Sequence, residues 1–567
     1  MDFNYDIINI IKQKTELDEG KINDLLEVPP NKKFGDVAFP CFILAKKFKK
    51  NPNDISKELS DEIDLKNYGS ITKVTNKGPY LNFFYNKKLV TKNVFEKFLS
   101  FDKDFRKEND DSKTIVVEFP APNTNKPLHL GHVRNLILSE SVCRLLESQG
   151  HDVKRVNLNN DRGIHICKSM LAYKIWGDGK KPNKKSDHFV GDYYVLYNQK
   201  LKDNPELEEK NRKLLKKWEE GDKEVMKLWS KMRNWALDGF KETYDRFDVE
   251  FEKEYFESDI YKNGKEIIEK AYDEGIFQKN DEGAIVANLD EYGEKVLLRA
   301  DGTSIYITQD IALAYKKYDD FKYDKSIYVV GNEQEYHFKV LFEVLSMLGF
   351  SSDICYHLSY GMINLPSGKM KSREGNVVDA DNLADELKKM TLNEVKKRNN
   401  LDEDKLNKVS EKISMGALRY FILKYSPRKD FTFRPKESIS LEGETGPYLQ
   451  YSLVRANRIL EKSETDFINY EGIAYDLLNN ESEIDLIKHL SDFDSILEKC
   501  ANDYSPHHLA NYGYELASLF NRFYEKNKVI GIDNEKRMMA RLCLVKVFSN
   551  VMSSVLYHLG IHEVDVM

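Results

Sequence analysis

The sequence predicts an α/β protein: a parallel-sheet core, a smaller α+β domain before it and an all-α bundle after it. Three observations lead to this fold class. A short β-branched segment, residues 114–119, is followed by a long helical pattern and then by a second strand-like segment. Alternating strand-like segments end the first 85 residues. Beyond residue 381 the pattern is helical almost to the end of the chain.

The core begins with TIVVEF, residues 114–119, a β-branched run suited to a buried parallel strand. A loop rich in Pro and Asn follows, and a helix is expected from about residue 130 to residue 149, before Gly150. A second strand is expected over 152–158. This strand–helix–strand order is the unit of a nucleotide-binding sheet, so the core is predicted to be Rossmann-like.

The other expected elements follow from periodicity and β-branched content. The further strands are expected at 71–74, 80–85, 284–286, 295–299, 304–307, 325–330 and 356–359. The C-terminal helices are expected at 448–461, 481–501, 506–525 and 535–558, and they indicate a helical bundle.

A chain of 567 residues is too long for one ordinary core. The changes in pattern divide it into four parts. These are an N-terminal domain at 1–110, the Rossmann-like domain at 111–380 with a charged, mostly helical insertion at about 165–300, a helical connector at 381–430 and a helical bundle at 431–567.

The composition is that of a soluble globular protein, with 41% hydrophobic and 32% charged residues and a mean hydropathy of −0.59. No apolar run approaches the ~18 residues of a membrane span, and the N-terminus has no signal-peptide pattern. Six scattered cysteines without a Cys-x-x-Cys pair make a zinc site or a disulfide framework unexpected, so a reduced, cytoplasmic compartment is predicted.

The net charge of −7 argues weakly against a protein that coats nucleic acid over its whole surface, although local basic patches remain compatible with it. Three basic clusters, at 46–50, 180–185 and 212–217, are candidates. Each of them taken alone is more simply explained as a solvated helix or loop face.

The first motif that carries chemistry is His129-Leu130-Gly131-His132, where the first core strand gives way to the long helix. Two histidines at i and i+3 lie on one face of a helix, and Gly131 between them lets a flat ring or a backbone approach closely. The helix N-terminus adds partial positive charge and free N–H groups. Together these features suit a polyphosphate beside an adenine.

The second motif is the Gly-bounded run GKMKSREGN, residues 368–376. Three cations within five residues, Lys369, Lys371 and Arg373, can close over phosphates during a reaction. Alone this run would be a solvated basic turn. Its pairing with the first motif makes it specific.

The two motifs together resemble the two signatures of class I aminoacyl-tRNA synthetases. The second motif has the order Lys-Met-Lys-Ser-Arg, a departure from the usual Lys-Met-Ser-Lys-Ser. In arginyl enzymes this motif is often degenerate, and a lysine just before the first motif is thought to compensate. Lys126 occupies that place. The division of the phosphate work among Lys126, Lys369, Lys371 and Arg373 stays open.

Further segments resemble the arginyl family, so that the resemblance covers nearly the whole chain. Residues 117–135, VEFPAPNTNKPLHLGHVRN, resemble its segment around the first motif. Residues 34–36 and 78–82 resemble its added N-terminal domain. Residues 446–451 and the helix at 506–525 resemble its helical anticodon domain.

The resemblance implies an arginine–tRNA ligase that forms arginyl-adenylate from arginine and ATP and then charges the 3′-terminal ribose of tRNA(Arg). Three sets of site residues follow from it. The ATP site comprises His129, Gly131, His132, Lys369 and Met370, with Lys126, Lys371 and Arg373 as further catalytic residues. The arginine pocket comprises Glu118, Asn123, His132, Tyr306, Asp310 and Gln334. The tRNA contacts comprise Tyr448, Tyr451, Tyr80 and Asn82.

Physical chemistry agrees with this assignment. A guanidinium presents five donors in a planar fork, which carboxylate or amide oxygens answer. Asp310, with Tyr306 four residues before it, is expected to face the guanidinium, while Glu118, Asn123 and Gln334 hold the α-amino and carboxylate ends. Tyr448 and Tyr451, flanked by Arg455 and Arg458, suit stacking of unpaired anticodon bases, although both tyrosines fit a core equally well.

Magnesium is expected to arrive with ATP without a dedicated protein site, no zinc is expected, and the chain is predicted to be a monomer that does not enter membranes. Family resemblance also implies that tRNA must be present before the first step. Two alternatives are compatible with parts of this pattern. Another class I synthetase, or a small adenylyl or cytidylyl transferase, shares the first motif. A non-catalytic RNA-binding relative would lack one of the two motifs, and both are present.

Overall fold

The computed structural model describes the chain except for residues 1–3, 32, 352, 365, 367–377 and 464–471. It forms two compact units, each assembled from separate stretches of the sequence. The first unit combines residues 1–102, 455–494 and 516–552, and the second combines residues 103–454, 495–515 and 553–567. The second unit therefore contains the whole of the predicted Rossmann-like domain.

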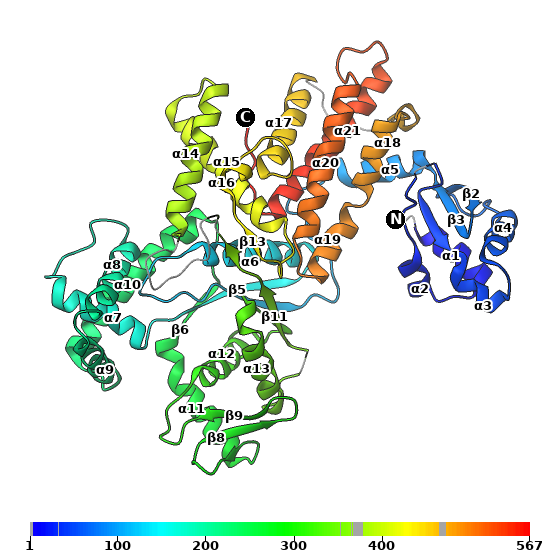
Figure 1. The fold of residues 1–567 in the computed structure, drawn as a ribbon. Coiled ribbons are helices and arrows are strands. Elements are labelled where there is room, and N and C mark those ends of the chain that lie inside the picture. Colours follow the sequence, from blue (N-terminus) through cyan, green and yellow to red (C-terminus); the bar gives the residue numbers. More distant parts are fainter. Residues whose placement is uncertain (1–3, 32, 352, 365, 367–377, 464–471) are drawn as a thin grey trace. The chain divides into compact units, whose positions relative to one another are not determined.

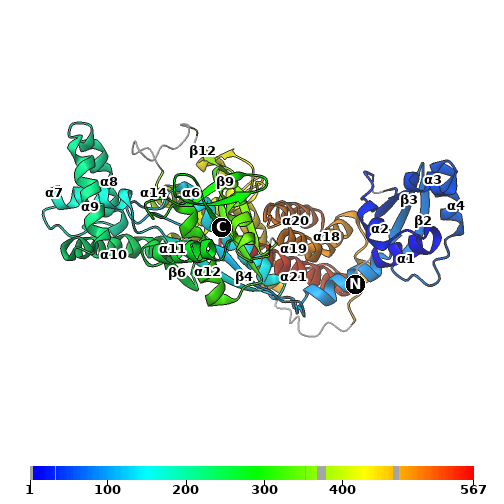
Figure 2. The same cartoon turned by 90° about the horizontal axis from the view of Figure 1, so that it is seen from below.

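The N-terminal part of the first unit is a small α+β fold around a three-stranded antiparallel sheet (Figure 2). Its strands β1 (Val37–Pro40), β2 (Ile71–Lys77) and β3 (Tyr80–Tyr85) lie in the order β1-β3-β2. β2 and β3 confirm the expected strands, and Gly78, at φ 56°, lies in the turn between them. The helices here are α1 (Asn4–Thr15), α2 (Glu19–Leu25), η1 (Cys41–Leu44), α3 (Ala45–Phe48) and α4 (Pro52–Glu62). α5 (Lys87–Phe98) follows the sheet and packs against helices within residues 475–491 of the same unit.

Five parallel strands form the central sheet of the second unit, in the order β11-β10-β4-β5-β6 (Figure 1). They are β4 (Thr114–Glu118), β5 (Asp152–Asn159), β6 (Lys253–Phe256), β10 (Lys325–Gly331) and β11 (Cys355–Tyr360). All but β6 confirm expected strands. Val116 and Val117 of the middle strand β4 are fully buried, as a strand covered on both faces requires. α6 (Leu130–Ser148) connects β4 to β5, which confirms the predicted strand–helix–strand unit.

The direction of strand succession changes beside β4. β5 and β6 follow on one side of it, whereas β10 and β11 lie on the other side. In open parallel sheets, a crevice that binds ligands forms at the carboxyl ends of the strands at such a switch point. The residues that follow β4, β5, β6 and β10 are therefore brought to one edge of the sheet.

The segment at 165–300 is built differently from the single insertion that we expected, because β6 in its middle belongs to the central sheet. Four helices lie between β5 and β6, and a small antiparallel sheet with a preceding helix follows β6 (Figure 1). The helices are α7 (Ile164–Trp176), α8 (Ser186–Leu201), α9 (Glu206–Glu219) and α10 (Lys223–Arg246). The later elements are α11 (Glu257–Asp273), β7 (Gln278–Lys279), β8 (Ile285–Leu289) and β9 (Gly293–Leu298).

The strand expected at 304–307 is wrong, because α12 (Tyr306–Phe321) begins there. The Thr308 hydroxyl accepts a hydrogen bond from the Ile305 N–H at 3.1 Å and donates one to the Leu297 carbonyl at 2.5 Å. This capping starts a helix in spite of the β-branched content of the segment. η2 (Asn332–Gln334) and α13 (Glu335–Met347) follow β10.

Helices dominate after residue 380, as predicted. The elements are α14 (Ala380–Arg398), α15 (Glu403–Leu423), α16 (Pro435–Ser438), α17 (Gly446–Ser463), η4 (Tyr475–Leu477), α18 (Glu481–Ser491), α19 (Phe493–Asn502), α20 (His507–Lys526) and α21 (Glu535–His558), with a parallel pair of strands, β12 (Ile363–Asn364) and β13 (Phe431–Thr432). The helix expected at 481–501 is two helices that separate at Asp492.

Within the described residues, one helix, α21, is long and apolar enough to cross a membrane by length and composition alone. In the most apolar window of this helix, 78% of the residues are buried inside the protein. Burial on this scale is what the core helix of a bundle requires, because such a helix is apolar on every face.

Candidate active site

The first motif forms the N-terminus of α6 in an unusual way, because its two histidines cap the helix reciprocally. Nδ1 of His129 accepts a hydrogen bond from the Gly131 N–H at 3.1 Å, and Nδ1 of His132 accepts one from the His129 N–H at 3.1 Å. The two rings stack with their centroids 3.9 Å apart. Since both Nδ1 atoms accept, each neutral ring carries its proton on Nε2.

The surroundings keep both rings uncharged. Burial first, and then the nearby charge of Lys126, lower the pKa of His129 to about 4. The pKa of His132 also lies well below its usual value, because of burial first and then because of His129 and Lys126. Burial lowers the pKa of Lys126 as well. Near neutral pH the site therefore offers two neutral Nε2–H donors at a helix N-terminus, a suitable arrangement for phosphate oxygens.

Gly131 is required by the stacked rings. A Cβ atom at this position would lie 2.9 Å from Cε1 of His129, closer than such contacts normally occur. The absence of a side chain thus lets the capping ring fold over the helix start, and it leaves a flat surface there.

The second motif lies outside the described residues, and so do Lys369, Met370, Lys371 and Arg373. The chain on both sides of it is bound to the first motif and its helix. After it, the Val378 carbonyl accepts a hydrogen bond from the Leu130 N–H at 3.0 Å, and the Ala380 N–H donates to the Leu128 carbonyl at 3.0 Å. Before the motif, the Gly361 carbonyl accepts a hydrogen bond from buried Arg134 of α6 at 2.5 Å. The chain therefore contacts α6 on both sides of the second motif.

Two predicted arginine-binding residues, Tyr306 and Asp310, lie one turn apart at the start of α12. Tyr306 is 78% exposed, so its ring is open to a ligand. Asp310 does not point freely into solvent: its Oδ2 lies 2.6 Å from Nε2 of His337 on α13. This contact orients the carboxylate, and it raises the pKa of His337.

The sequence reasoning missed Glu257, the first residue of α11 directly after β6. Burial first, and then the negative charges of Asp161 and Asp310, raise the pKa of Glu257 to about 7, although Arg162 and a hydrogen bond from Gln309 oppose this rise. A buried carboxylate whose charge is opposed by neighbouring acids is a candidate site for a cation. The sequence does contain one signal for Glu257, since this carboxylate directly follows the aromatic run Tyr255-Phe256. That run ends the strand β6, which lies inside the segment predicted as an insertion.

Glu118 lies at the carboxyl end of β4 and already has a partner inside the protein. Its Oε2 accepts a hydrogen bond from Nζ of Lys317 at 2.6 Å, and the Lys317 side chain is completely buried. The same ammonium donates to Ser326 at 3.0 Å and lies 3.8 Å from the ring centroid of Tyr328. This internal ion pair already occupies one of the two carboxylate oxygens of Glu118.

The other predicted arginine-binding residues follow strands at the same edge of the sheet. Asn123 lies in the loop after β4, where it pairs with Asn160 after β5 in an isolated bridge. Gln334 ends η2 just after β10 and is exposed. β4 pairs with both β5 and β10, so these residues come from neighbouring strand ends.

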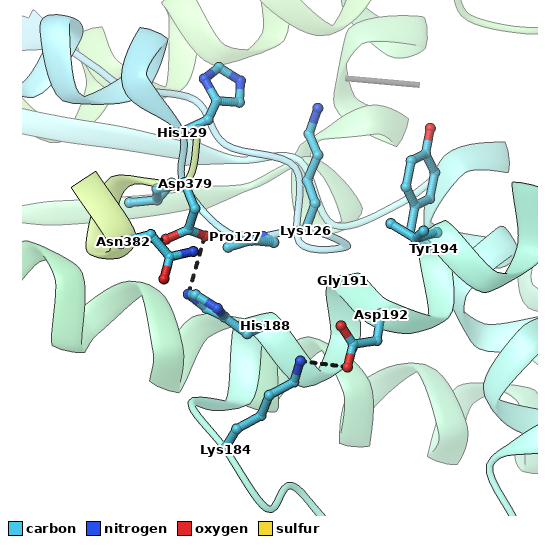
Figure 3. A pocket seen from close by; sticks show the side chains of 12 residues that line it. Lys126, Pro127, His129, Lys184, His188, Gly191, Asp192, Tyr194, Asp379 and Asn382 are labelled. Carbon is cyan, nitrogen blue, oxygen red and sulfur yellow. Dashed lines mark hydrogen bonds and ion pairs between the residues drawn. The ribbon is translucent and has the colours of Figure 1, made fainter. Parts of the chain in front are cut away.

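A cavity of about 280 Å³ lies beside Lys126 and His129, and one wall of it comes from α8 (Figure 3). Figure 3 shows Lys126, His129 and Tyr194 extending to the same side. Nε2 of His188 lies 3.2 Å from Oδ2 of Asp379, the residue whose backbone bridges to His129. The α8 helix is thereby connected to the segment that leaves the second motif.

Beneath this wall, Lys185 lies within an acidic cluster. Its Nζ is 3.0 Å from Asp187 and 2.8 Å from Asp381, and it donates to Thr243 at 2.6 Å. Asp187, His188 and Asp381 are close enough to hold a metal ion, but the ammonium of Lys185 already supplies a cation there. Hydrogen bonds from His188 and Lys185 outweigh burial and lower the pKa of Asp381 to about 2.

The predicted tRNA contacts differ in exposure. Tyr448 and Tyr451 on α17 are half-buried, and the ring of Tyr448 lies 5.7 Å from that of Tyr514. Tyr80 is half-buried and meets the exposed ring of Phe42 edge-on. Asn82 is only 2% exposed and donates to the Tyr80 carbonyl, which leaves its side chain no surface for RNA.

Three family models match the chain. The catalytic domain of class I (R) tRNA synthetases matches residues 94–434, the DALR anticodon-binding domain matches residues 449–567, and the arginyl-tRNA synthetase N-terminal domain matches residues 3–85. Together with the paired histidines at the carboxyl edge of a parallel sheet, the first match defines a class I aminoacyl-tRNA synthetase.

Similar proteins identify the branch of this class. The chain is 46% identical to an arginine–tRNA ligase of Treponema denticola, over 94% of this chain and 93% of that protein, and 42% identical to one of Borrelia turicatae, over 97% and 95%. The chain belongs to the arginyl-tRNA synthetase family.

Solved structures of this family share the fold. Arginyl-tRNA synthetase of Thermus thermophilus has a TM-score of 0.81 at 24% identity, covering 100% of this chain and 99% of that one. The Plasmodium falciparum enzyme has a TM-score of 0.79 at 20% identity, covering 100% and 98%.

Proposed function

We propose that this chain works as an arginine–tRNA ligase through the geometry at the carboxyl edge of its central sheet. The carrying observation is the reciprocal capping of α6 by His129 and His132, which occupies Nδ1 of both rings and leaves each neutral ring with an Nε2–H donor. The acids Glu257 and Asp310 lie at the same edge. A phosphate site beside an acidic slot is what joining ATP to arginine requires.

The reaction has two steps. A carboxylate oxygen of arginine attacks the α-phosphorus of ATP, pyrophosphate leaves, and arginyl-adenylate forms. A hydroxyl of the terminal ribose of the tRNA, at the 2′ position if class I behaviour holds, then attacks the arginyl carbonyl carbon and AMP leaves. The protein takes no covalent part, so positioning and neutralisation of phosphate charge supply the catalysis.

We assign the phosphate work to the two motifs. His129 and His132 donate to oxygens of the α-phosphate as it becomes five-coordinate, and adenine lies against Gly131. Lys126 and the second motif residues Lys369, Lys371 and Arg373 neutralise the leaving pyrophosphate, and Met370 contacts the nucleotide. Magnesium arrives with ATP and is held by its phosphates, and no zinc takes part.

The arginine slot is defined by two acids. The substrate guanidinium lies between Glu257 and Asp310, with the exposed ring of Tyr306 beside it. A planar guanidinium has five N–H donors, so it can donate hydrogen bonds to both carboxylates at once. Asn123 and Gln334 hold the α-amino and carboxylate ends together with His132. Glu118 supports this edge through its ion pair with Lys317.

The tRNA and the rest of the molecule follow from the family. Tyr448 and Tyr451 stack on anticodon bases, and Tyr80 contacts the body of the tRNA, whereas buried Asn82 drops out. The domain division given above stays part of the proposal, and the family models match residues 3–85, 94–434 and 449–567. The chain works as a monomer in the cytoplasm without contact to membranes, where its six buried, free cysteines stay reduced.

Aminoacylation of total tRNA with each labelled amino acid, in the presence of ATP and Mg²⁺, tests the proposal. Only arginine is expected to be attached, and prior removal of tRNA(Arg) from the pool should abolish the product. Attachment of a different amino acid, or arginine attachment that survives this removal, would refute it.

A further inference from the structure

Arg162 lies between β5 and α7, and it contacts Glu257 of the proposed guanidinium slot. One of its terminal nitrogens, Nη1, is 3.6 Å from Oε1 of Glu257. The other, Nη2, is 3.2 Å from Oε1 of Glu219, near the end of α9. The guanidinium also lies 4.1 Å from the ring centroid of Tyr261, one turn after Glu257 on α11. Four groups on two helices thus hold one side chain: Glu257, Tyr261, Glu219 and, with its ring centroid 5.6 Å away, Trp218.

The contacts of Arg162 are poorly explained by stability alone. The side chain is only 14% exposed, yet its buried Nε–H has no acceptor among the described residues. A buried donor without a partner costs stability, so a purely structural position would favour a residue whose donors are all satisfied. The two carboxylates that it faces lie on different elements, α9 and α11. The arrangement therefore suits a residue that connects these elements.

The charges around Glu257 give Arg162 a specific task. Asp161 and Asp310 face Glu257 with like charge, Gln309 donates a hydrogen bond to it, and Arg162 is the cation that acts on it. Asp161 is itself held by Arg233 at 3.2 Å and by the Ser258 hydroxyl at 2.7 Å. Without Arg162, Glu257 would lose the strongest positive charge that acts on it, while the charges of two acids would still oppose its ionisation.

We propose that Arg162 is a positioning residue for arginine selection: it holds the Glu257 carboxylate charged and oriented for the substrate guanidinium, and it links this slot to helix α9 through Trp218 and Glu219. The inference rests on the proposed function of Glu257. One carboxylate then lies between two guanidinium groups, that of Arg162 on one side and that of the substrate on the other. The substrate contacts Glu257 and never Arg162.

The test uses steady-state aminoacylation by the full-length protein with tRNA(Arg), between pH 6 and pH 9. Arg162→Gln is expected to raise KM for arginine about tenfold or more near pH 7.5, because Glu257 loses its nearest cation and becomes protonated more readily. KM for ATP and kcat should stay within about twofold, since neither depends on ionisation of Glu257 at saturating arginine. Raising the pH should lower the KM of Arg162→Gln for arginine most of the way back to the wild-type value.

Three further variants make the outcome decisive. Arg162→Lys keeps a cation without the planar stack, so its KM for arginine should lie between those of the wild type and Arg162→Gln. Glu219→Gln loosens the link to α9 and should raise the same KM by a smaller factor. Arg434→Gln, which removes an exposed arginine paired with Glu437, serves as the matched control and should change nothing.

An unchanged KM for arginine in Arg162→Gln, or an equal loss for ATP and arginine at every pH, would overturn the inference. If Arg162→Gln fails to fold, Arg162→Lys and Glu219→Gln decide by the same criteria. The proposed function fails by a different result, namely a wild-type protein that attaches no arginine to tRNA.

Discussion

At the scale of single residues, His129 does two jobs that can be separated by substitution. It caps α6 through Nδ1 and, as proposed, donates to the α-phosphate through Nε2. Asparagine is among the best N-cap residues, so His129→Asn keeps the cap but removes the Nε2–H donor. His129→Ala removes both.

The unfolding temperature of His129→Asn is therefore expected to equal that of the wild type. The rate of tRNA-dependent ATP–pyrophosphate exchange should fall about 100-fold, which is the usual cost of losing one preorganised hydrogen-bond donor. His129→Ala should show the same loss of rate and about 1 kcal/mol less stability. His151→Ala, a substitution at the opposite end of β5, is the matched control. A wild-type exchange rate in His129→Asn would contradict the assigned role.

The pH dependence of arginine binding follows from Glu257. Burial and neighbouring acids raise its pKa to about 7, so the charged form that binds a guanidinium is lost as the pH falls through that value. KM for arginine is expected to rise by about tenfold per unit below about pH 6 and to level off above about pH 8. His129, with its pKa at about 4, stays neutral throughout, so KM for ATP should remain flat. A flat profile for arginine as well would exclude Glu257 as a ligand.

Prediction from the sequence succeeds for residues with a local signature. The first motif was recognisable because two histidines around a glycine at a strand-to-helix turn have few other uses. Glu257 was not recognisable, because its meaning depends on β6 joining the central sheet, a long-range pairing of a short strand that contains two charged residues. The ion pair between Glu118 and Lys317 joins residues 199 apart in sequence, and no local pattern reports it.

At the scale of elements, the sequence predicts the strongly apolar strands correctly, but its prediction for the ambiguous segment at 304–307 is wrong. TIVVE and KSIYVV are buried on both faces and carry a continuous apolar signal. SIYI has the same β-branched content, but the Thr308 hydroxyl accepts a hydrogen bond from the Ile305 N–H, and α12 begins there. Local propensity is a weak prior, and here a single cap outweighs it.

If the arginine slot is formed as proposed, the packing of α11 on α12 sets its width, since Glu257 starts one helix and Asp310 lies in the first turns of the other. Gly264 on α11 makes the approach possible: a Cβ there would lie 2.3 Å from the Thr308 carbonyl oxygen. Backbone cannot yield as a flexible side chain does, so Gly264→Ala should push the two helices apart.

Gly264→Ala is expected to destabilise the protein by about 1–3 kcal/mol and to raise KM for arginine more than KM for ATP. Thermal unfolding and the two KM values measure this. Gly69→Ala is the control, because nothing lies within 4 Å of a Cβ at that position. Equal behaviour of the two variants would show that the helix contact does not set the slot.

At the scale of the whole molecule, the last residues of the chain return to the catalytic unit. The Ser141 hydroxyl on α6 donates to the His558 carbonyl at 2.7 Å, and Arg144 on α6 donates to the Tyr557 carbonyl at 2.8 Å. Gln450 donates to the His562 carbonyl at 2.7 Å. The C-terminal half of the helix that begins with the first motif is thus held by the end of the chain, within the same compact unit.

Val564 shows how much depends on this tail, because it is only 4% exposed within an apolar cluster whose other buried members are Val395, Leu406, Val409, Ile413 and Val454. Val564→Asp would place an unpaired carboxylate among aliphatic side chains, so the tail should detach and α6 should lose its support. Burial of an aliphatic side chain stabilises a protein by about 1.5–3 kcal/mol, so thermal denaturation should show a lower unfolding temperature. Because α6 carries the catalytic histidines, aminoacylation should be at least about tenfold slower. Asp565→Ala, at the exposed neighbouring position, should leave both unchanged. Wild-type activity in Val564→Asp would mean that α6 and its histidines keep their place without the C-terminal tail.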